Sequence, residues 1–150
     1  MRVVVQRVSG AVLRIDGDVF SSIDHGMLVL VGIETGDTPE ELEWIADKVV
    51  GLRIFEDEDG VMNRSVLETG GSIMAVSQFT LTASTRKGRR PSYIRAERPE
   101  TAAPVYDSFC RRLEELCGRP VARGVFGADM KITLTNSGPV TIIIDSRLKE

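Results

Sequence analysis

A chain of 150 residues with a formal net charge of −3 is long enough to bury a hydrophobic core without a metal or a disulfide to hold it together. Hydrophobic residues make up 42% of it and charged residues 27%, and no apolar run approaches the roughly 20 residues that cross a bilayer, which excludes a membrane-spanning helix. Because arginines at positions 2, 7 and 14 interrupt the start of the chain, it lacks the apolar core of a secretory signal, and we expect one domain over residues 1–150, a cytoplasmic location and no contact with a membrane.

The first 33 residues predict a series of strands separated by short turns. The strands are expected at residues 2–8, 11–15, 19–23 and 27–33, with turns at 16–18 and 24–26. The run MLVLVGI at 27–33 is apolar almost throughout, and it therefore predicts a strand that is buried on both faces.

A helix is predicted to follow, beginning at Thr38. Thr38 can cap the helix, Pro39 suits its first position, and Glu41 can return a hydrogen bond to the cap. Apolar residues then recur at helical spacing, and Gly51 is expected to end the helix.

The middle of the chain predicts more strands and a long loop. Strands are expected at 52–55 and 72–81, with turns at 57–60 and at Gly70–Gly71. Residues 82–98 have no periodicity and are rich in Arg, Ser, Gly and Pro, which is typical of a surface loop.

A second helix is predicted from about Pro99 or Thr101 to Cys117, with Gly118 after its end. Its apolar stripe would consist of Tyr106, Phe109, Cys110, Leu113, Leu116 and Cys117. Pro104 fits only in the first turn, because proline further inside would break a hydrogen bond. Strands at 121–126, 129–136 and 140–145 complete the chain, and the order of elements favours an α+β fold: a single domain of barrel-like mixed β-sheets with two helices packed on one face.

Several common kinds of site are not supported. Cys110 and Cys117 are seven residues apart on a helix, about 10 Å along its axis, which is too far for a disulfide, and there is no Cys/His cluster, so we expect neither a metal nor another cofactor. The single histidine, His25, lies in an Asp-His-Gly turn rather than beside a nucleophile. The stretch 124–127 has neither the length nor the lysine of a phosphate-binding loop.

The charges are unevenly distributed along the chain. Acidic residues dominate between Glu34 and Asp59, whereas residues 86–98 contain six basic residues and one acidic residue. A local basic patch on an acidic protein suggests a polyanionic partner at one edge, and a solvated basic loop is the alternative.

Two polar interruptions remain. Residues 77–80, SQFT, end a hydrophobic strand where side chains and free amides can enter a cleft, although the strand could simply run into a loop. Gly138–Pro139 separates two β-branched runs and would make an ordinary turn if Asn136 and Ser137 bonded their own backbone. A peptide bond before proline is also nearly the only kind that can be cis, which changes the direction of successive carbonyls.

These stretches together carry a family resemblance. The segments QRV, GMLVLVGIE, LRIFEDEDGVMN, VSQFTL, KGRRPSY, VYDSF, GVFGADM and NSGPVT follow one another from end to end of the chain. In order and spacing they resemble D-aminoacyl-tRNA deacylases. The resemblance implies hydrolysis of the ester between a D-amino acid and tRNA, and of glycine mischarged on alanine tRNA, and it favours functional roles for SQFT and Gly138–Pro139 over the loop and turn alternatives.

The resemblance also implies roles around SQFT. The backbone amides of Phe79 and Thr80 would stabilise the oxyanion, while Ser77 and Gln78 would hold the terminal adenosine. Phe126 and Met130 would line the same pocket. Thr80 could instead act as a nucleophile, but no base is at hand to activate it, so attack by water with help from the neighbouring ribose hydroxyl is preferred.

The remaining implied roles concern chirality and RNA. In the family, Gly138–Pro139 would be cis and enter the partner subunit's active site, where its carbonyls hold the substrate ammonium group and L side chains are excluded, with Arg7 orienting the carbonyls. A homodimer with a cross-subunit site follows. The basic loop residues expected to contact phosphates of the aminoacyl-tRNA, with no role in DNA binding, are Arg86, Lys87, Arg89 and Arg90. The chain departs from the family at Ser137, where Asp is commoner, and an RNA-binding module without turnover remains the alternative function.

Overall fold

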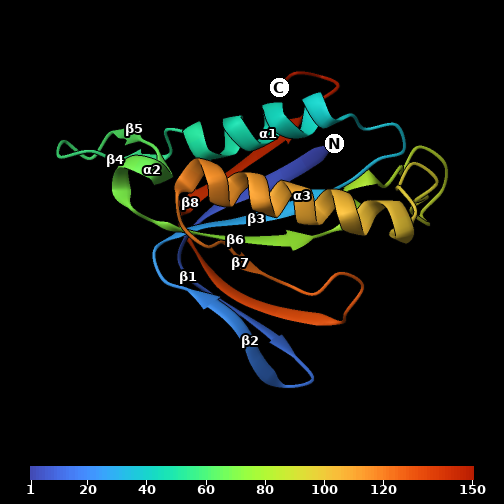
Figure 1. Ribbon diagram of the computed structural model, residues 1–150, viewed down its shortest axis with the longest axis horizontal. Helices are drawn as coiled ribbons and strands as arrows, with labels where there is room; N and C mark the ends of the chain where they lie inside the picture. Colours follow the sequence, from blue (N-terminus) through green and yellow to red (C-terminus); the bar gives the residue numbers. More distant parts are fainter.

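The computed structural model describes residues 1–150, and its centre is a six-stranded mixed sheet that curls into a nearly closed barrel (Figure 1). The strands are β1 (Arg2–Ile15), β2 (Asp18–Ile23), β3 (Gly26–Gly32), β6 (Ser72–Ser77), β7 (Ala122–Arg123) and β8 (Met130–Asp145), in the order β2-β1-β3-β6-β7 with β8 on β1. β1 is antiparallel to β2, β3 and β8, whereas β3, β6 and β7 run parallel to one another. The predicted barrel-like α+β fold is confirmed.

β1 is continuous, although two separate strands were predicted for it. Its first half pairs with β3 from Arg2 to Val8, and its second half pairs with β2 from Ala11 to Ile15. On its other edge β1 pairs with β8 along nearly its whole length, and this pairing keeps β1 continuous where its partner changes from β3 to β2.

Two long helices lie side by side over one face of the sheet, as expected (Figure 1). α1 (Pro39–Gly51) begins with the predicted reciprocal hydrogen bonds between Thr38 and Glu41. α3 (Pro99–Cys117) ends at Gly118, which adopts a left-handed conformation. None of the helices is long and apolar enough to cross a lipid bilayer.

Pro104 contradicts one expectation. It lies inside α3, beyond the first turn, because the helix begins as early as Pro99. Proline has no N–H to donate to the carbonyl four residues earlier, that of Glu100, so the helix tolerates one missing bond near its start.

The core has two parts, one on each side of β3 and β6. On the helix side, Val29 and Val31 of β3 pack with buried residues of α1 and α3 such as Ile45 and Phe109. Inside the curled sheet, Leu28 packs in a smaller cluster with residues of β1, β2 and β6. Burial of each such side chain contributes about 1.5–3 kcal/mol, and burial on both faces of β3 is what its apolar sequence predicted.

Short elements complete the chain and correct several boundaries. A two-stranded ribbon is formed by β4 (Phe55–Glu56) and β5 (Met62–Arg64), so most of the strand predicted at 52–55 is irregular. The four-residue helix α2 (Val66–Thr69), capped by Ser65, was not predicted. The strand predicted at 121–126 is reduced to β7, while those at 129–136 and 140–145 are one strand, β8.

Candidate functional site

A cleft of about 680 Å³ opens where β3 and β6 end. Its walls come from the ends of both strands, from the segment 93–97, from the start of α3 and from residues 126–132, which lead into β8. Eleven of its 18 lining residues are hydrophobic. Parallel strands commonly present ligand sites at their carboxyl ends, and this cleft lies at that end of the parallel pair.

The SQFT stretch forms the turn at this end of the sheet. The N–H of Gln78 donates to the Val31 carbonyl at 2.7 Å, and the chain then leaves the sheet as the 3₁₀ helix η1 (Phe79–Thr82). The strand predicted to continue to residue 81 therefore stops at Ser77. Gly32 allows the turn, since a Cβ on it would lie 2.9 Å from the Leu81 Cβ.

The turn leaves main-chain donors unpaired. The first N–H groups of a helix have no acceptor within it. In η1 the first turn bond runs from the Leu81 N–H to the Gln78 carbonyl, at 3.2 Å, so the N–H groups of Phe79 and Thr80 precede it. Two adjacent free donors beside a largely apolar cleft can stabilise an oxyanion.

Thr80 follows Phe79 and is not one of the residues that line the cleft. Its hydroxyl oxygen accepts a hydrogen bond from the Gln78 amide at 2.7 Å. His25 is elsewhere, with its ring 5.2 Å from that of Phe55. This geometry gives no support to a nucleophilic hydroxyl, because no base touches it.

Aromatic rings frame the cleft. Phe79 is 55% exposed and meets the Tyr93 ring edge-on, with centroids 5.1 Å apart. Phe126, another lining residue, has its ring 6.2 Å from that of Tyr106. The cleft thus brings together Ser77, Gln78, Phe79, Phe126 and Met130, all of which had been selected from the sequence.

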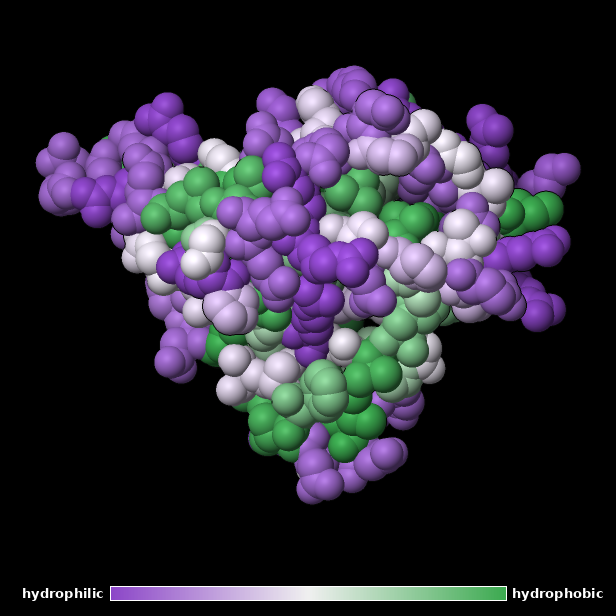
Figure 2. Space-filling model, in the orientation of Figure 1, coloured by the Kyte–Doolittle hydropathy of each residue, from purple (hydrophilic) through white to green (hydrophobic).

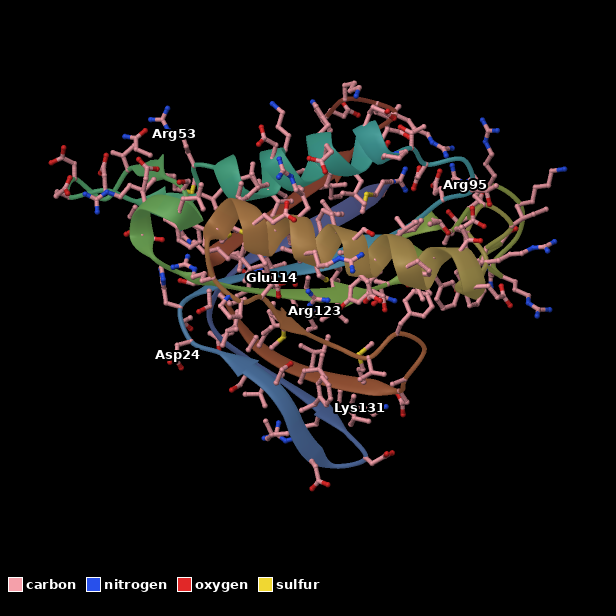
Figure 3. All side chains as sticks on the ribbon, viewed as in Figure 1. Asp24, Arg53, Arg95, Glu114, Arg123 and Lys131 are labelled. Carbon is pink, nitrogen blue, oxygen red and sulfur yellow. The ribbon has the colours of Figure 1, made fainter.

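Tyr106 connects α3 to β6 just before the SQFT turn. Its hydroxyl donates to the Ala75 carbonyl at 2.8 Å in a buried position. Burial raises the pKa of Tyr106, so the hydroxyl stays protonated and able to donate. Below α3, the Arg123 guanidinium lies 2.9 Å from the Glu114 carboxylate, which fixes the chain on the way to Phe126 (Figure 3).

Among the lining residues that were not predicted, four carry polar groups: Tyr93, Glu97, Arg98 and Asp129. Tyr93 stands in the KGRRPSY segment, so its position in that segment was an available signal. Glu97 and Arg98 precede α3 in a stretch without periodicity, where nothing in the sequence distinguishes them from loop residues.

Gly138 and Pro139 form a bulge in β8. The register with β1 shifts between the pairs Gln6–Thr141 and Val8–Asn136, so the residues between them project opposite Arg7. The Gly138–Pro139 peptide bond is cis. The strand continues through the bulge without a hairpin turn.

Arg7 secures this bulge although only 8% of the residue is exposed. Its Nε donates to the Ser137 carbonyl at 3.0 Å, and its Nη1 donates to the Ile54 carbonyl at 2.7 Å. Gly138 has φ +128°, and a Cβ there would lie 2.8 Å from Arg7 Nη2. The backbone conformation therefore favours glycine at 138, and a Cβ there would also displace the Arg7 guanidinium.

The bulge and the cleft lie at opposite ends of the sheet. Val8 pairs with Gly26, which pairs with Ser72 at the start of β6, whereas Ser77 ends β6 at the cleft. Five strand residues separate these points by about 17 Å. Arg7, Gly138 and Pro139 consequently do not line the cleft of their own chain.

The predicted phosphate-binding residues lie beside the cleft. Arg86 and Lys87 line a second hollow, and Arg89 and Arg90 are exposed further along the same loop. In the space-filling view this loop forms the hydrophilic projections at the right edge of the molecule (Figure 2).

Comparisons with known proteins agree on one family. A family model described as D-Tyr-tRNA(Tyr) deacylase matches residues 4–145. A D-aminoacyl-tRNA deacylase of Parabacteroides distasonis is 61% identical over 150 residues, and one of Bacteroides thetaiotaomicron is 56% identical over 150 residues, with 100% of both chains covered in each case.

Solved structures are similar along almost the whole chain. A protein titled c-Myc DNA Unwinding Element Binding Protein has a TM-score of 0.92 and 39% identity, covering 97% of this chain and 98% of its own. A probable eukaryotic D-amino acid tRNA deacylase has a TM-score of 0.82 at 20% identity, covering 95% of this chain and 97% of its own, which shows a shared fold.

Proposed function

The chain belongs to the D-Tyr-tRNA(Tyr) deacylase family, a family of hydrolases, and we propose that it hydrolyses the ester that joins a D-amino acid to the terminal ribose of tRNA. The products are the free D-amino acid and tRNA. The observation that carries the proposal is the pair of free N–H groups at the start of η1, those of Phe79, which lines the cleft, and of the next residue, Thr80.

In the proposed reaction the protein supplies position and electrostatics. Water adds to the ester carbonyl, and the N–H groups of Phe79 and Thr80 stabilise the resulting oxyanion. The ester C–O bond then breaks, the ribose oxygen takes up one of the water's two protons, the other passes to solvent, and the amino acid leaves as its carboxylate. The adjacent ribose hydroxyl assists the attacking water, since the engaged Thr80 hydroxyl has no base beside it.

The cleft lining supports a binding mode for the charged RNA end. Ser77 and Gln78 contact the terminal adenosine, and Phe126 and Met130, which line the same cleft, bound the space for the amino acid. A largely apolar cleft with few polar groups suits a nucleoside and a variable side chain.

Chiral selection is proposed to act across a homodimer. The carbonyls of Gly138 and Pro139 of the partner subunit would hold the substrate ammonium group, so that an L side chain meets the backbone and a D side chain avoids it. Two observations support this: both residues are exposed, and they lie too far along the sheet to reach their own cleft. Arg7 orients the bulge through the Ser137 carbonyl.

Two further properties belong to the same proposal. Glycine has no side chain to exclude, so glycine mischarged on alanine tRNA is also a substrate. Arg86, Lys87, Arg89 and Arg90 contact tRNA phosphates, which makes binding dependent on salt and tolerant of sequence. DNA is not expected as a partner, although one similar solved structure is titled a DNA unwinding element binding protein.

The test is hydrolysis of D-tyrosyl-tRNA and L-tyrosyl-tRNA by substoichiometric protein. We expect many turnovers of the D ester and none of the L ester. Binding of both RNAs without turnover would instead favour a non-catalytic RNA-binding module. A parallel assay with glycyl-tRNA(Ala) at equal concentration ranks the achiral substrate against the D ester.

A further inference from the structure

The second hollow, of about 760 Å³, lies between residues 83–87 and 92–95, and we name it the basic groove. Its polar lining consists of the cations Arg86, Lys87 and Arg95 and the hydroxyl residues Ser84, Thr85 and Ser92. No carboxylate lines it. Cations and hydroxyl donors without a carboxylate are suited to anionic oxygens such as those of phosphodiesters.

The groove has a built framework. Ser84 and Ser92 pair through two main-chain hydrogen bonds of 2.8 and 2.9 Å, which join its two walls. Arg95 donates from Nη2 and Nε to the Thr82 carbonyl, at 3.1 and 3.3 Å. These bonds tie the groove to the last residue of η1, and hence to the SQFT turn.

Arg95 also retains a charge that can act on a ligand. It lies 3.8 Å from the Glu34 carboxylate, but Arg147 approaches that carboxylate more closely, at 3.1 Å. The Arg95 side chain is 46% exposed. In Figure 3 Arg95 lies at the end of the molecule where the basic loop meets the start of α3.

One segment forms a wall of both the cleft and the groove. Tyr93 lines the cleft, whereas its neighbours Ser92 and Ile94 line the groove. Residues 93–96 form a turn, closed by a hydrogen bond of 2.9 Å from the Ala96 N–H to the Tyr93 carbonyl, so one short segment separates the cleft from the groove. An RNA whose last nucleoside occupies the cleft therefore reaches the groove within its next few nucleotides.

We propose that the basic groove binds the phosphodiester backbone of the single-stranded 3′ end of the substrate RNA, next to the nucleoside held in the cleft. This inference rests on the proposed function. It separates the basic loop into Arg86 and Lys87, which line the groove, and Arg89 and Arg90, which lie outside it. A single strand fits better than a duplex, since Ile94 is 87% exposed at the groove and offers an apolar surface to an unpaired base.

The test measures binding of a fluorescent RNA tetranucleotide ending in CCA, by anisotropy, so that it does not depend on turnover. The variant R86Q/K87Q should weaken binding about tenfold and reduce the slope of log K against log salt by about 1.4, as expected for two lost contacts to a single strand. The variant K48Q/R111Q removes the same charge from the exposed faces of α1 and α3 and should change binding less than twofold.

Other arms locate the site and separate the two proposals. The variant R89Q/R90Q should weaken tetranucleotide binding less than half as much as R86Q/K87Q, and a blunt RNA hairpin should compete poorly. Equal effects of the two loop variants, or equal competition by the hairpin, would overturn the groove. Hydrolysis of 3′-O-(D-tyrosyl)adenosine probes the cleft alone: its absence beside intact RNA binding would overturn the proposed function and leave the groove standing.

Discussion

Arg2 and Arg7, five residues apart on β1, show how differently the two ends of the sheet are built. At the cleft end, Arg2 Nη1 donates to the Leu81 carbonyl at 3.0 Å and Nε donates to Asp145 at 2.8 Å, which fixes η1 against the end of β8. At the bulge end, Arg7 donates to the Ser137 carbonyl, beside Gly138. One arginine secures a turn with free N–H groups, and the other secures a bulge next to exposed carbonyls.

Main-chain groups become available for chemistry only where the regular strand pairing stops. A regular ladder consumes both the donors and the acceptors of its strands. The cleft exists because β6 leaves the sheet at Gln78, and the bulge exists because β8 carries extra residues opposite Arg7. The free N–H groups at the cleft end suit an anion, and the carbonyls at the bulge end suit a cation. Hydrolysis of an aminoacyl ester involves both, as the developing oxyanion and the ammonium group.

The largest expected effect tests the free donors of the cleft. Thr80→Pro removes one N–H at the start of a helix, where proline is tolerated, and should lower kcat for D-tyrosyl-tRNA by about 10²–10³. The matched variant Thr80→Ala keeps the N–H and should retain activity within about tenfold of the original, because the hydroxyl is already engaged by Gln78. Equal losses in both, with unchanged thermal unfolding, would point to the hydroxyl instead.

The bulge is tested by Gly138→Ala. The new Cβ would meet Arg7 Nη2 at 2.8 Å in a backbone conformation with φ +128°, so the carbonyls should move. Misplacement by about 1 Å can cost 10² in rate, and we expect a loss of this order in kcat/KM for the D ester together with a smaller ratio of D to L turnover.

Gly60→Ala is the control for this strain. Gly60 also has positive φ, at +74°, but a Cβ there meets nothing within 4 Å. It should lower the melting temperature slightly and leave the D to L ratio unchanged. If Gly138→Ala behaved in the same way, the bulge would have no part in selection.

A smaller effect is expected from removing the Tyr106 hydroxyl, which holds α3 to the strand that leads into the cleft. Tyr106→Phe leaves the buried Ala75 carbonyl without its side-chain donor, which costs about 1–3 kcal/mol of stability. Because Ala75 lies two residues before Ser77, kcat should also fall, by about tenfold, with KM nearly unchanged. Leu113→Ala, a change at a buried position of the same helix outside the cleft lining, should lower the unfolding temperature without lowering kcat.

Some elements of the fold could be predicted from the sequence, and others could not. Thr38, Pro39 and Glu41 predicted the start of α1 because capping is a local interaction, and the apolar run of β3 predicted burial on both faces. Phe79 and Leu81, by contrast, continue the alternation of β6, so η1 looked like strand. Its turn depends on the close approach of Leu81 to Gly32, a contact between distant residues that no local pattern encodes.

The site was likewise predictable only in part. The family resemblance predicted Ser77, Gln78, Phe126 and Met130 as site residues, and all four line the cleft. Tyr93 was missed because its partner, Phe79, is fourteen positions away in a region without periodicity. Pro104 was misjudged because the position of a helix start, and not the proline itself, decides whether it lies in the first turn.

The smallest expected effect concerns the ion pair at the cleft end. Burial would by itself raise the pKa of Asp145, but hydrogen bonds from Arg2, Arg147 and Leu148 lower it below the usual value. A carboxyl with a depressed pKa stabilises the fold above its unfolded pKa of about 3.9 and loses that contribution as pH falls through the folded value. Asp145→Asn should therefore lower the melting temperature by about 2–4 °C at pH 7, and this difference should disappear below about pH 4.

Asp129→Asn is the control, because Asp129 is an exposed carboxylate paired with Lys131. Its melting temperature should follow that of the unmodified chain across the same pH range, since exposed pairs contribute little. If the difference in melting temperature between Asp145→Asn and the unmodified chain stayed constant with pH, packing and not the carboxylate charge would hold η1 against the end of β8.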